Sequence, residues 1–201
     1  MMPALALVAA YLIGAIPFGF LLVKWKTGAD IRASGSGNIG ATNVLRTTGW
    51  QTGAATLILD IAKGYFAVWL AGYLTGADPI WMAAAALAVM AGHAFPIFLR
   101  GKGGKAVASF VGAWACLTPL PLAATLVVFL AMVGWTRFIS VGSIVAAGTF
   151  PFAVWLISHP PLPVMLAAVV SGAFIVYRHR ENIVRLRAGN EHVFSLRRAR
   201  P

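Results

Sequence analysis

The chain contains very few acidic residues and a single cysteine. Among its 201 residues, five are Asp or Glu and one is a cysteine, Cys116. One cysteine excludes a disulfide framework, and nothing suggests a metal cluster. A Walker phosphate loop, a Gly-x-Ser-x-Gly elbow and a His-x-x-x-x-Asp acyltransferase pair are absent as well. We therefore expect no metal and no other cofactor, and the five acids do not assemble a Ser-His-acid triad.

Charge of either sign is scarce, whereas long apolar runs are abundant. Charged residues make up 10% of the chain and hydrophobic residues 60%, while a soluble domain carries about a quarter charged residues. Apolar runs near twenty residues recur throughout, as in proteins that cross a membrane. We expect an all-α integral membrane protein that forms one domain over residues 1–201. The formal net charge of +11 then reflects cytoplasmic loops, which collect Lys and Arg, rather than nucleic acid.

Seven apolar runs predict seven transmembrane helices. They cover residues 3–23, 53–75, 79–99, 105–117, 119–136, 139–158 and 161–177. No basic segment precedes the first run, and Lys24 and Lys26 follow it, so a spanning helix fits better than a cleaved signal peptide. One helix over 105–136 would be about 48 Å long against ~30 Å of hydrocarbon, so we expect two helices that turn at 118–121.

The distribution of positive charge indicates the orientation. With seven spans, fifteen of the sixteen Lys and Arg residues lie in or beside four segments on one side: 24–52, 100–104, 137–138 and 178–201. The opposite loops contain none. Because positive residues mark the cytoplasmic side, we expect the N-terminus outside, the C-terminus in the cytoplasm and the functional site on the cytoplasmic side.

The first candidate segment is "SGSGNIGATNVLRTTG", residues 34–49, a small polar loop with one charge. Glycines permit positive φ, which lets successive N–H groups converge on an anion, and Arg grips phosphate with two parallel bonds. The segment therefore favours a phosphate site over a flexible connection between helices. Its candidate ligands are Ser36, Gly37, Asn38, Gly40, Thr42, Asn43 and Arg46.

The second candidate segment is "GHAFPIFLRGKGGKAVAS", residues 92–109. Lys102 and Lys105 enclose Gly103 and Gly104 just before a new helix begins, which suggests another cradle for phosphate or carboxylate. The alternative is a short basic loop that anchors the chain at the membrane surface. The glycines and the nearby His93 bring the two interpretations close to even.

The third candidate segment is "YRHRENIVRLRAGNE", residues 177–191. On a helix, Arg178, Asn182 and Arg185 share one face, with His179 beside Asn182, and Glu191 follows. The alternative is a basic helix lying on anionic headgroups. On such an anchor His179 and Asn182 are less expected.

Two further polar pairs lie within the apolar runs. Asp60 and Lys63 are three residues apart inside the second run, and ionisable groups at membrane depth usually pair and face protein. We expect a structural ion pair there rather than direct catalysis. Ser140 and Ser143 begin the sixth run, where they either cap the helix or point into the cytoplasmic site.

The three segments, in this order and on this topology, resemble the three motifs of the bacterial acyl-phosphate-dependent glycerol-3-phosphate acyltransferases. The resemblance implies a seven-helix inner-membrane enzyme of phospholipid synthesis. Such an enzyme transfers a fatty acyl group from acyl phosphate to the 1-hydroxyl of sn-glycerol 3-phosphate and releases lysophosphatidic acid and phosphate. Two positions depart from the family: Gly101 stands where an aromatic residue is common, and Ala106 where glycine is common.

The resemblance also implies roles for individual residues. Phosphate groups would be held by Ser36, Asn38, Asn43 and Arg46. The acyl phosphate would be cradled by Lys102, Lys105 and the neighbouring glycines, with His93 supporting the loop. Glycerol 3-phosphate would be bound and oriented by His179 and Asn182, with Ser140 or Ser143 as further candidates. The residues expected to be catalytic are Ser36, Arg46, Lys105, His179 and Asn182.

Acyl phosphate is already activated, so we expect no covalent acyl-enzyme. A substrate phosphate oxygen is expected to accept the hydroxyl proton, with His179 as the alternative base. The expected partners are glycerol 3-phosphate, acyl phosphate and membrane lipid. The alternative function is a transporter or channel for phosphate esters or other anions. It requires a polar path to the outer side, where these runs offer mainly Trp, Phe and Ala.

Overall fold

The structure is a computed structural model that describes residues 1–194, and all regular secondary structure over these residues is helical. The terminal arginines of the expected cytoplasmic tail, Arg197, Arg198 and Arg200, lie outside the described residues. Tertiary contacts divide the chain into two compact units, Met1–Leu117 and Thr118–Pro201. The sequence predicted one domain, and that remains a prediction.

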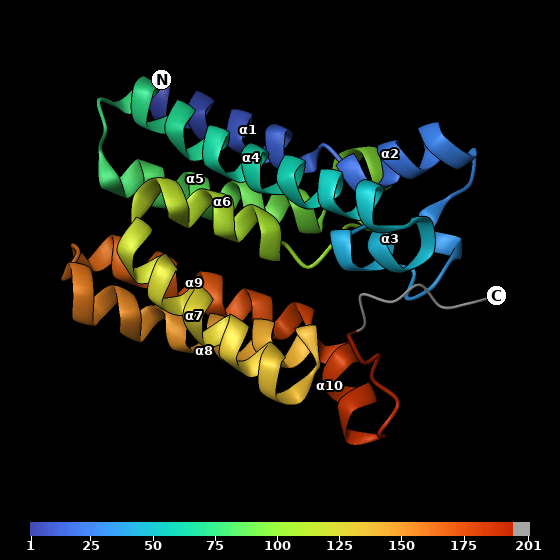
Figure 1. Ribbon diagram of the computed structural model, residues 1–201. Coiled ribbons are helices and arrows are strands. Elements are labelled where there is room, and N and C mark those ends of the chain that lie inside the picture. The colour runs from blue at the N-terminus through green and yellow to red at the C-terminus, as the bar shows by residue number, and fades with distance from the viewer. Residues whose placement is uncertain (195–201) are drawn as a thin grey trace. The chain divides into compact units, whose positions relative to one another are not determined.

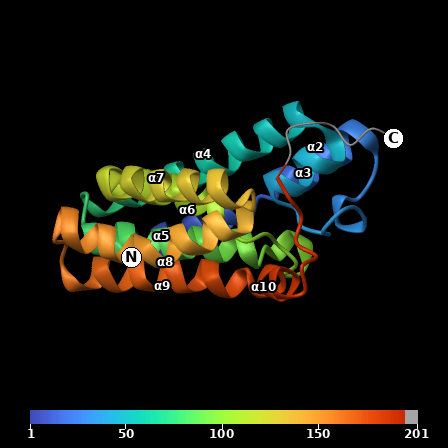
Figure 2. The same ribbon diagram turned by 60° about the horizontal axis from the view of Figure 1, so that its bottom comes forward.

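The first unit contains six α-helices and two short 3-10 helices. They are α1 (Met2–Ala15), α2 (Phe18–Thr27), η1 (Ile31–Ala33), α3 (Ala41–Thr48), α4 (Trp50–Thr75), α5 (Pro79–Ala94), η2 (Ile97–Leu99) and α6 (Val107–Leu117). Helices α1, α4, α5 and α6 run side by side, and α2 and α3 lie at one end of the unit (Figures 1 and 2). The loop segments of the first two motifs therefore belong to this unit.

Close packing in the first unit depends on glycine. A Cβ added at Gly14 of α1 would overlap the backbone of Val89 in α5, and one at Gly112 of α6 would overlap the backbone of Ile61 in α4. Helices in membranes associate through such small residues, because lipid gives apolar side chains no reason to prefer one another. The backbones of these helix pairs can approach closely only where a side chain is missing.

The second unit, as far as residue 194, contains four helices. They are α7 (Pro119–Thr136), α8 (Ile139–Ser158), α9 (Leu162–Arg178) and α10 (Arg180–Arg187). Helix α8 packs against both α7 and α9, and α10 continues from the end of α9 (Figure 1). The chain bends by 50° between α9 and α10, so the helix expected after the last apolar run begins in a new direction at His179.

The apolar runs predicted the helices well. Five stretches within residues 1–194 are long and apolar enough to cross a membrane, and six if the bent pair α9 and α10 counts as one span. The expected turn in 105–136 is confirmed, because α6 ends at Leu117 and α7 begins at Pro119. Helix α6 has only 11 residues, too short by itself to span ~30 Å of hydrocarbon. The count of seven spans and their orientation stay predictions.

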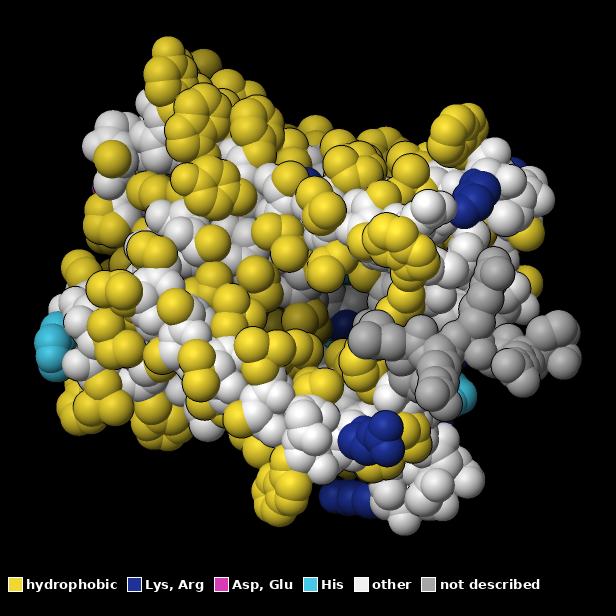
Figure 3. Space-filling model, in the orientation of Figure 1, with side chains coloured by type: hydrophobic (Ala, Val, Ile, Leu, Met, Phe, Trp, Pro, Cys, Tyr) yellow, Lys and Arg dark blue, Asp and Glu magenta, His cyan; other side chains and the backbone are white. Residues whose placement is uncertain are grey.

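Hydrophobic side chains cover most of the molecular face shown in Figure 3. Large apolar residues on the outside of α4 include Ile58, Phe66 and Trp69, and those on α8 include Phe152 and Trp155. Exposed apolar surface on this scale is rare in soluble proteins. It fits helices whose outer faces contact lipid.

Candidate functional site

Asn43 organises the loop of the first motif. Its side chain is 2% exposed. Its Oδ1 accepts a hydrogen bond from Ser36 N–H at 3.0 Å, and its Nδ2 donates to the carbonyl oxygens of Ser34 at 3.0 Å and Asn38 at 2.8 Å. Gly35 has φ of +59°, and a Cβ there would overlap Asn43 Oδ1. The amide of Asn43 therefore shapes the loop, and its polar atoms are used by the backbone.

Other N–H groups that the sequence suggested for anion binding are also used within the loop. Gly37 N–H donates to Ser34 O at 3.0 Å, and Gly40 N–H donates to Asn38 Oδ1 at 2.8 Å. With Ser36 N–H bound to Asn43, three N–H groups of the expected nest stabilise the loop itself. This differs from the sequence prediction, in which backbone donors converge on the ligand.

Side chains are therefore the groups that the first motif presents outward. Thr42 and Arg46 are exposed and four residues apart, so they lie on the same face of α3. Ser36 is half-buried in the loop before that helix. An anion at the first motif would meet one guanidinium and two hydroxyl groups.

The second motif lies directly against the carboxyl end of α5. Gly103 N–H donates to Ala94 O at 3.2 Å, and Gly104 N–H donates to His93 O at 3.1 Å. Both carbonyls belong to the last turn of α5, where a helix has no further N–H groups of its own to donate to them. A Cβ at Gly103 would overlap the carbonyl oxygen of His93, and one at Gly104 would overlap His93 Nε2. The two glycines are thus required for close approach.

The lysines of this loop stand between two residues with left-handed backbone. Arg100 has φ of +54° and Ala106 has φ of +63°, a conformation that costs a non-glycine residue about 1–2 kcal/mol. Lys102 is exposed and Lys105 is half-buried. The positive φ at Ala106 is a conformation that glycine adopts without steric cost, which fits the glycine that the resemblance leads us to expect there.

A shared hydrophobic cluster joins the first and second motifs. Ile39 and Val44 of the first motif pack with Val23 of α2, Ile31 of η1 and Leu99 of η2. All five are at most 7% exposed. The structure therefore brings the first two candidate segments together in one unit. The meeting of all three segments on the cytoplasmic side stays a prediction.

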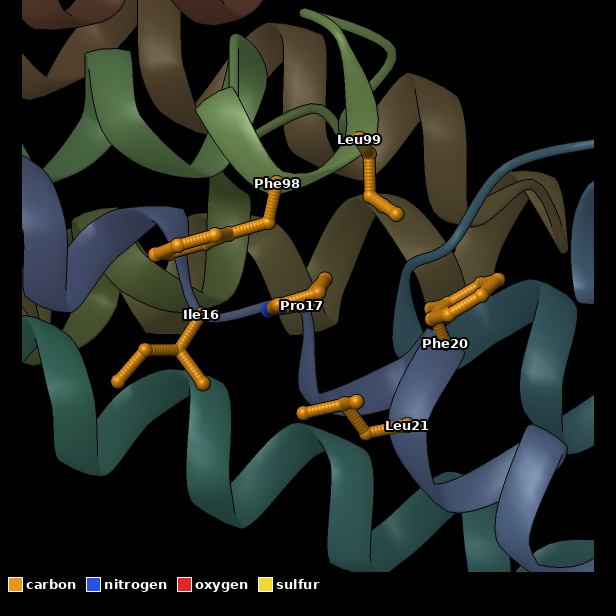
Figure 4. Close-up of a pocket in the computed structure, with 6 residues that line it drawn as sticks. All are labelled: Ile16, Pro17, Phe20, Leu21, Phe98 and Leu99. Atoms are coloured by element: carbon orange, nitrogen blue, oxygen red, sulfur yellow. The ribbon is translucent and has the colours of Figure 1, made fainter.

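An apolar pocket of about 370 Å³ adjoins this cluster. It is lined by Ile16, Pro17, Phe20, Leu21, Phe98 and Leu99. Phe98 and Leu99 extend from η2 toward the break between α1 and α2, where Ile16 and Pro17 lie (Figure 4). No polar side chain lines the pocket, and Leu99 belongs to both the pocket and the cluster.

In the second unit, His179 stands at the bend between α9 and α10. The ring is 3% exposed, and its Nδ1 lies 2.8 Å from Ile175 O. Since a carbonyl oxygen only accepts, Nδ1 carries the proton, and a neutral ring then has its lone pair on Nε2. The same carbonyl accepts from His179 N–H at 3.1 Å, so the side chain enters the helix's own hydrogen-bond ladder where the helix bends.

Glu191 draws the remaining residues of the third motif together. Asn182 Nδ2 donates to Glu191 Oε1 at 2.6 Å, and Arg185 Nε donates to Oε2 at 2.8 Å. Burial alone raises the pKa of the Glu191 carboxyl. Hydrogen bonds from Asn182 and Arg185 and the nearby Ser140 hydroxyl outweigh that effect, so the pKa lies below its usual 4.5. The shared face predicted for Asn182 and Arg185 is confirmed, while Arg178 lies on the other side of the bend.

Two buried polar atoms of this group have no hydrogen-bond partner among the described residues. They are Asn182 Oδ1 and Ser140 Oγ. The Ser140 hydroxyl is near enough to Glu191 to affect its pKa, but its geometry completes no hydrogen bond. Ser143 differs, because its hydroxyl donates to Ile139 O at 2.9 Å within α8. Asn182 and Ser140 thus retain acceptor or donor capacity, while the Ser143 hydroxyl serves its own helix.

Sequence reasoning overlooked Ser109. Its Oγ lies 3.1 Å from His93 Nδ1, and the side chain is completely buried. A lone serine in an apolar helix gives no signal by itself. A usable signal was its position at the end of the second motif, which also contains His93 on the preceding long helix. Each ring nitrogen of a buried histidine needs a hydrogen-bond partner, and a nearby serine can provide one.

Comparisons with known proteins show which family this chain belongs to. The model of the glycerol-3-phosphate acyltransferase family matches residues 4–189. A glycerol-3-phosphate acyltransferase from Geotalea daltonii is 46% identical over 189 residues, which cover 94% of this chain and 95% of the relative. The enzyme of that name from Geobacter sulfurreducens is 47% identical over 185 residues, or 92% of this chain and 94% of the relative.

Solved structures are similar over almost the whole chain. A crystal structure of an integral membrane glycerol 3-phosphate acyltransferase in its glycerol 3-phosphate form matches with a TM-score of 0.91 at 37% identity, covering 97% of this chain and 96% of the other. The lysophosphatidic acid form matches with a TM-score of 0.88 at 35% identity, covering 98% and 97%. The resemblance inferred from the three motifs is thereby confirmed: this chain belongs to the glycerol-3-phosphate acyltransferase family and is an integral membrane acyltransferase.

Proposed function

We propose that the protein transfers a fatty acyl group from acyl phosphate to the 1-hydroxyl of sn-glycerol 3-phosphate. The products are 1-acylglycerol 3-phosphate and inorganic phosphate, an acylation step of phospholipid synthesis. Family membership supports the acyl acceptor and the type of reaction. The choice of acyl phosphate as donor rests on the three motifs and on the chemistry of the side chains that they present.

The observation that carries the proposal is the shared cluster of the first two motifs. It joins the loop before Arg46 to the loop that bears Lys102 and Lys105. Three cations in one region suit substrates that each carry a phosphate group. Arg46 binds phosphate oxygens in pairs, and the lysines act as point charges. We assign the acyl phosphate to the lysines and a phosphate group to Arg46 and Ser36.

We assign the acceptor to groups of the third motif. Asn182 Oδ1 and Ser140 Oγ are buried polar atoms with unused capacity among the described residues, and His179 has a tautomer with the lone pair on Nε2. A hydroxyl donor such as the acceptor alcohol satisfies such atoms. We therefore assign His179 and Asn182 to binding and orienting glycerol 3-phosphate. Glu191 holds Asn182 in place.

The reaction requires no enzyme nucleophile. The 1-hydroxyl oxygen attacks the acyl carbonyl carbon, the bond to the phosphate oxygen breaks, and phosphate leaves with its electron pair. Cations beside the phosphate stabilise the charge that develops on it, and holding both substrates in place supplies much of the acceleration. A phosphate oxygen of a substrate accepts the hydroxyl proton, with His179 as the alternative base.

The pocket beside Leu99 suits the first carbons of the acyl chain. Its lining is apolar, and the same η2 segment leads directly into the lysine loop. An acyl phosphate held by Lys102 and Lys105 would have its chain beside an apolar wall. The protein is then a multi-pass protein of the bacterial inner membrane, with seven spans, the N-terminus outside and the site open to the cytoplasm.

The direct test is turnover by purified protein in detergent micelles. Palmitoyl phosphate and glycerol 3-phosphate should give lysophosphatidic acid and inorganic phosphate in equal amounts, whereas palmitoyl-CoA in place of palmitoyl phosphate should give neither. Turnover with palmitoyl-CoA alone would refute the proposed donor. Anion flux in proteoliposomes without any acyl transfer would instead support the alternative of a transporter.

The variant His179→Gln separates the two candidate bases. Glutamine keeps a donor for Ile175 O but cannot accept a proton. If a substrate phosphate is the base, the variant has reduced activity but the same shape of pH–rate profile as the unmodified protein, and added imidazole does not restore activity. Recovery of activity with a substituted imidazole would show that His179 itself takes the proton.

A further inference from the structure

The first unit contains a buried ion pair that the proposed reaction does not use. Asp60 and Lys63 of α4 are each 3% exposed at the side chain, and Lys63 Nζ lies 2.7 Å from Asp60 Oδ1. Burying two charges costs several kcal/mol per ion. A pair at this depth in an apolar helix therefore needs further partners.

Lys63 connects the pair to the break between α1 and α2. Its Nζ donates to Ile16 O at 2.8 Å and lies 5.6 Å from the centre of the Phe18 ring. Pro17 ends α1, because the residue before a proline is driven out of the helical conformation, and Ile16 accordingly has ψ of 113°. A carbonyl released from a helix within a membrane needs a donor from protein. Lys63 supplies it.

Asp60 connects the pair to His93. Its Oδ1 lies 3.7 Å from His93 Nδ1, and Ser109 Oγ lies 3.1 Å from the same nitrogen. All three side chains are at most 4% exposed. On one side of the His93 ring, a hydroxyl from α6 therefore lies within hydrogen-bond distance, and a carboxylate from α4 lies just beyond that distance.

The other side of the same ring faces the second motif. Nε2 of His93 lies where a Cβ of Gly104 would be, and the carbonyl oxygen of His93 accepts from Gly104 N–H at 3.1 Å. The position of the ring therefore determines how closely Gly104 can approach α5. Lys105 follows Gly104 directly, so a shift of the ring displaces a lysine that we assign to the acyl phosphate.

We propose that Asp60 and Lys63 are positioning residues for the loop 100–106, acting through His93. The carboxylate of the ion pair packs beside the histidine ring and limits where it can lie. The ring sets the position of Gly104, and Gly104 sets that of Lys105. Lys63 also ties this network to Ile16, which lines the apolar pocket. The consequence for catalysis rests on the proposed function, whereas the mechanical coupling does not.

The test uses a double variant, Asp60→Asn with Lys63→Gln, in the full chain, so that both charges are removed while an amide N–H remains for Ile16 O. Removing both charges together leaves no uncompensated charge, and replacing a buried pair by neutral groups is often harmless to stability. Ser109→Ala removes the second support of His93 without touching a charge. Thr56→Val is the matched control, because Thr56 is buried on the same helix and its hydroxyl donates to Thr52 O, with no other hydrogen-bond partner among residues 1–194.

Two measurements distinguish positioning from stability. We expect the double variant to raise KM for palmitoyl phosphate about tenfold, by displacing a substrate-binding group, with KM for glycerol 3-phosphate and the apparent Tm little changed. Ser109→Ala should raise the KM for palmitoyl phosphate by a smaller factor. Trypsin should cleave the double variant faster after Arg100, Lys102 or Lys105, with unchanged cleavage after Arg46.

The proposal would be overturned if the double variant had the same KM values and tryptic cleavage rates as Thr56→Val. It would also be overturned if the double variant raised KM equally for both substrates and lowered Tm. The proteolysis needs no substrate. If the unmodified protein fails to use palmitoyl phosphate but the double variant still exposes the loop, the proposed function fails and the positioning role stands.

Discussion

Replacing Glu191 by Gln removes a negative charge from the centre of the hydrogen-bond network in the second unit. The carboxylate accepts from both Asn182 and Arg185, and its side chain is 6% exposed. Glutamine retains one acceptor oxygen, but its amide nitrogen then faces an N–H donor. One of the two bonds is lost, and Asn182 or Arg185 is left with a donor pointed at another donor.

The size of the effect follows from these contacts. A hydrogen bond to a charged group contributes about 1.5–3 kcal/mol. The bond from Arg185 is at the low end, because its side chain is 29% exposed and solvent screens the pair. We expect Glu191→Gln to lower stability by about 2 kcal/mol. For a chain of this length that corresponds to a decrease of about 4–8 °C in apparent Tm.

Thermal unfolding of the purified variant in detergent measures this directly. Glu181→Gln is the control, because it removes an equal charge from an exposed position in the first turn of α10 and should cost about 0.5 kcal/mol. Equal Tm values for Glu191→Gln and Glu181→Gln would refute the reasoning. The activity of Glu191→Gln should also fall through a raised KM for glycerol 3-phosphate, since Asn182 loses its support.

The pH dependence gives a second check on Glu191. Its pKa in the folded protein lies below the usual 4.5, so the unfolded state binds the proton more readily. The stabilisation is therefore fully present above pH 4.5 and is lost as the pH falls through the lower, folded-state pKa. The Tm difference between the unmodified protein and Glu191→Gln should narrow as the pH is lowered below 4.5. A difference that stays constant there would contradict the assignment.

Three other substitutions test the remaining groups. Arg46→Lys keeps the charge but loses the paired hydrogen bonds to phosphate, so activity should fall about tenfold or more while Tm stays within about 1 °C. A variant as active as the unmodified protein would count against phosphate binding by Arg46. Gly104→Ala places a Cβ on His93 Nε2 and should abolish most activity, and a fully active variant would show that the loop does not need this close approach. Ala106→Gly relieves a φ of +63° and should raise stability by about 0.5–1 kcal/mol, after the greater entropy of glycine in the unfolded chain is subtracted. An unchanged or lower Tm would contradict that strain.

The apolar runs gave the positions of the long helices because helix length in a membrane follows from the thickness of the hydrocarbon layer. The run 119–136 matches α7 and the run 139–158 matches α8 residue for residue. The helix α3 was not predicted. It has eight residues and no apolar run, and its formation depends on Val44 packing into the cluster of the first two motifs, a contact that sequence alone does not reveal.

The polar residues of the candidate site were identified by type, but their partners were not. Asn43 has the chemistry of a phosphate ligand in the sequence, and in the structure its amide binds Ser34, Ser36 and Asn38. Loops rich in small polar residues must satisfy their own backbone before they can bind anything else. A sequence shows which donors exist, and only the fold shows which of them the loop uses for itself.

The same principle changes the role of the glycines. In the sequence they suggested flexible backbone around an anion, whereas Gly103 and Gly104 lie in contact with His93 and donate to the end of α5. We expect a loop held in this way to be rigid, so that the lysines on either side of the two glycines keep their positions before substrate binds. Because preorganised charges cost no rearrangement at the moment of reaction, such a loop would make these cations more effective in the proposed reaction, although its N–H groups bind the end of α5 rather than a ligand.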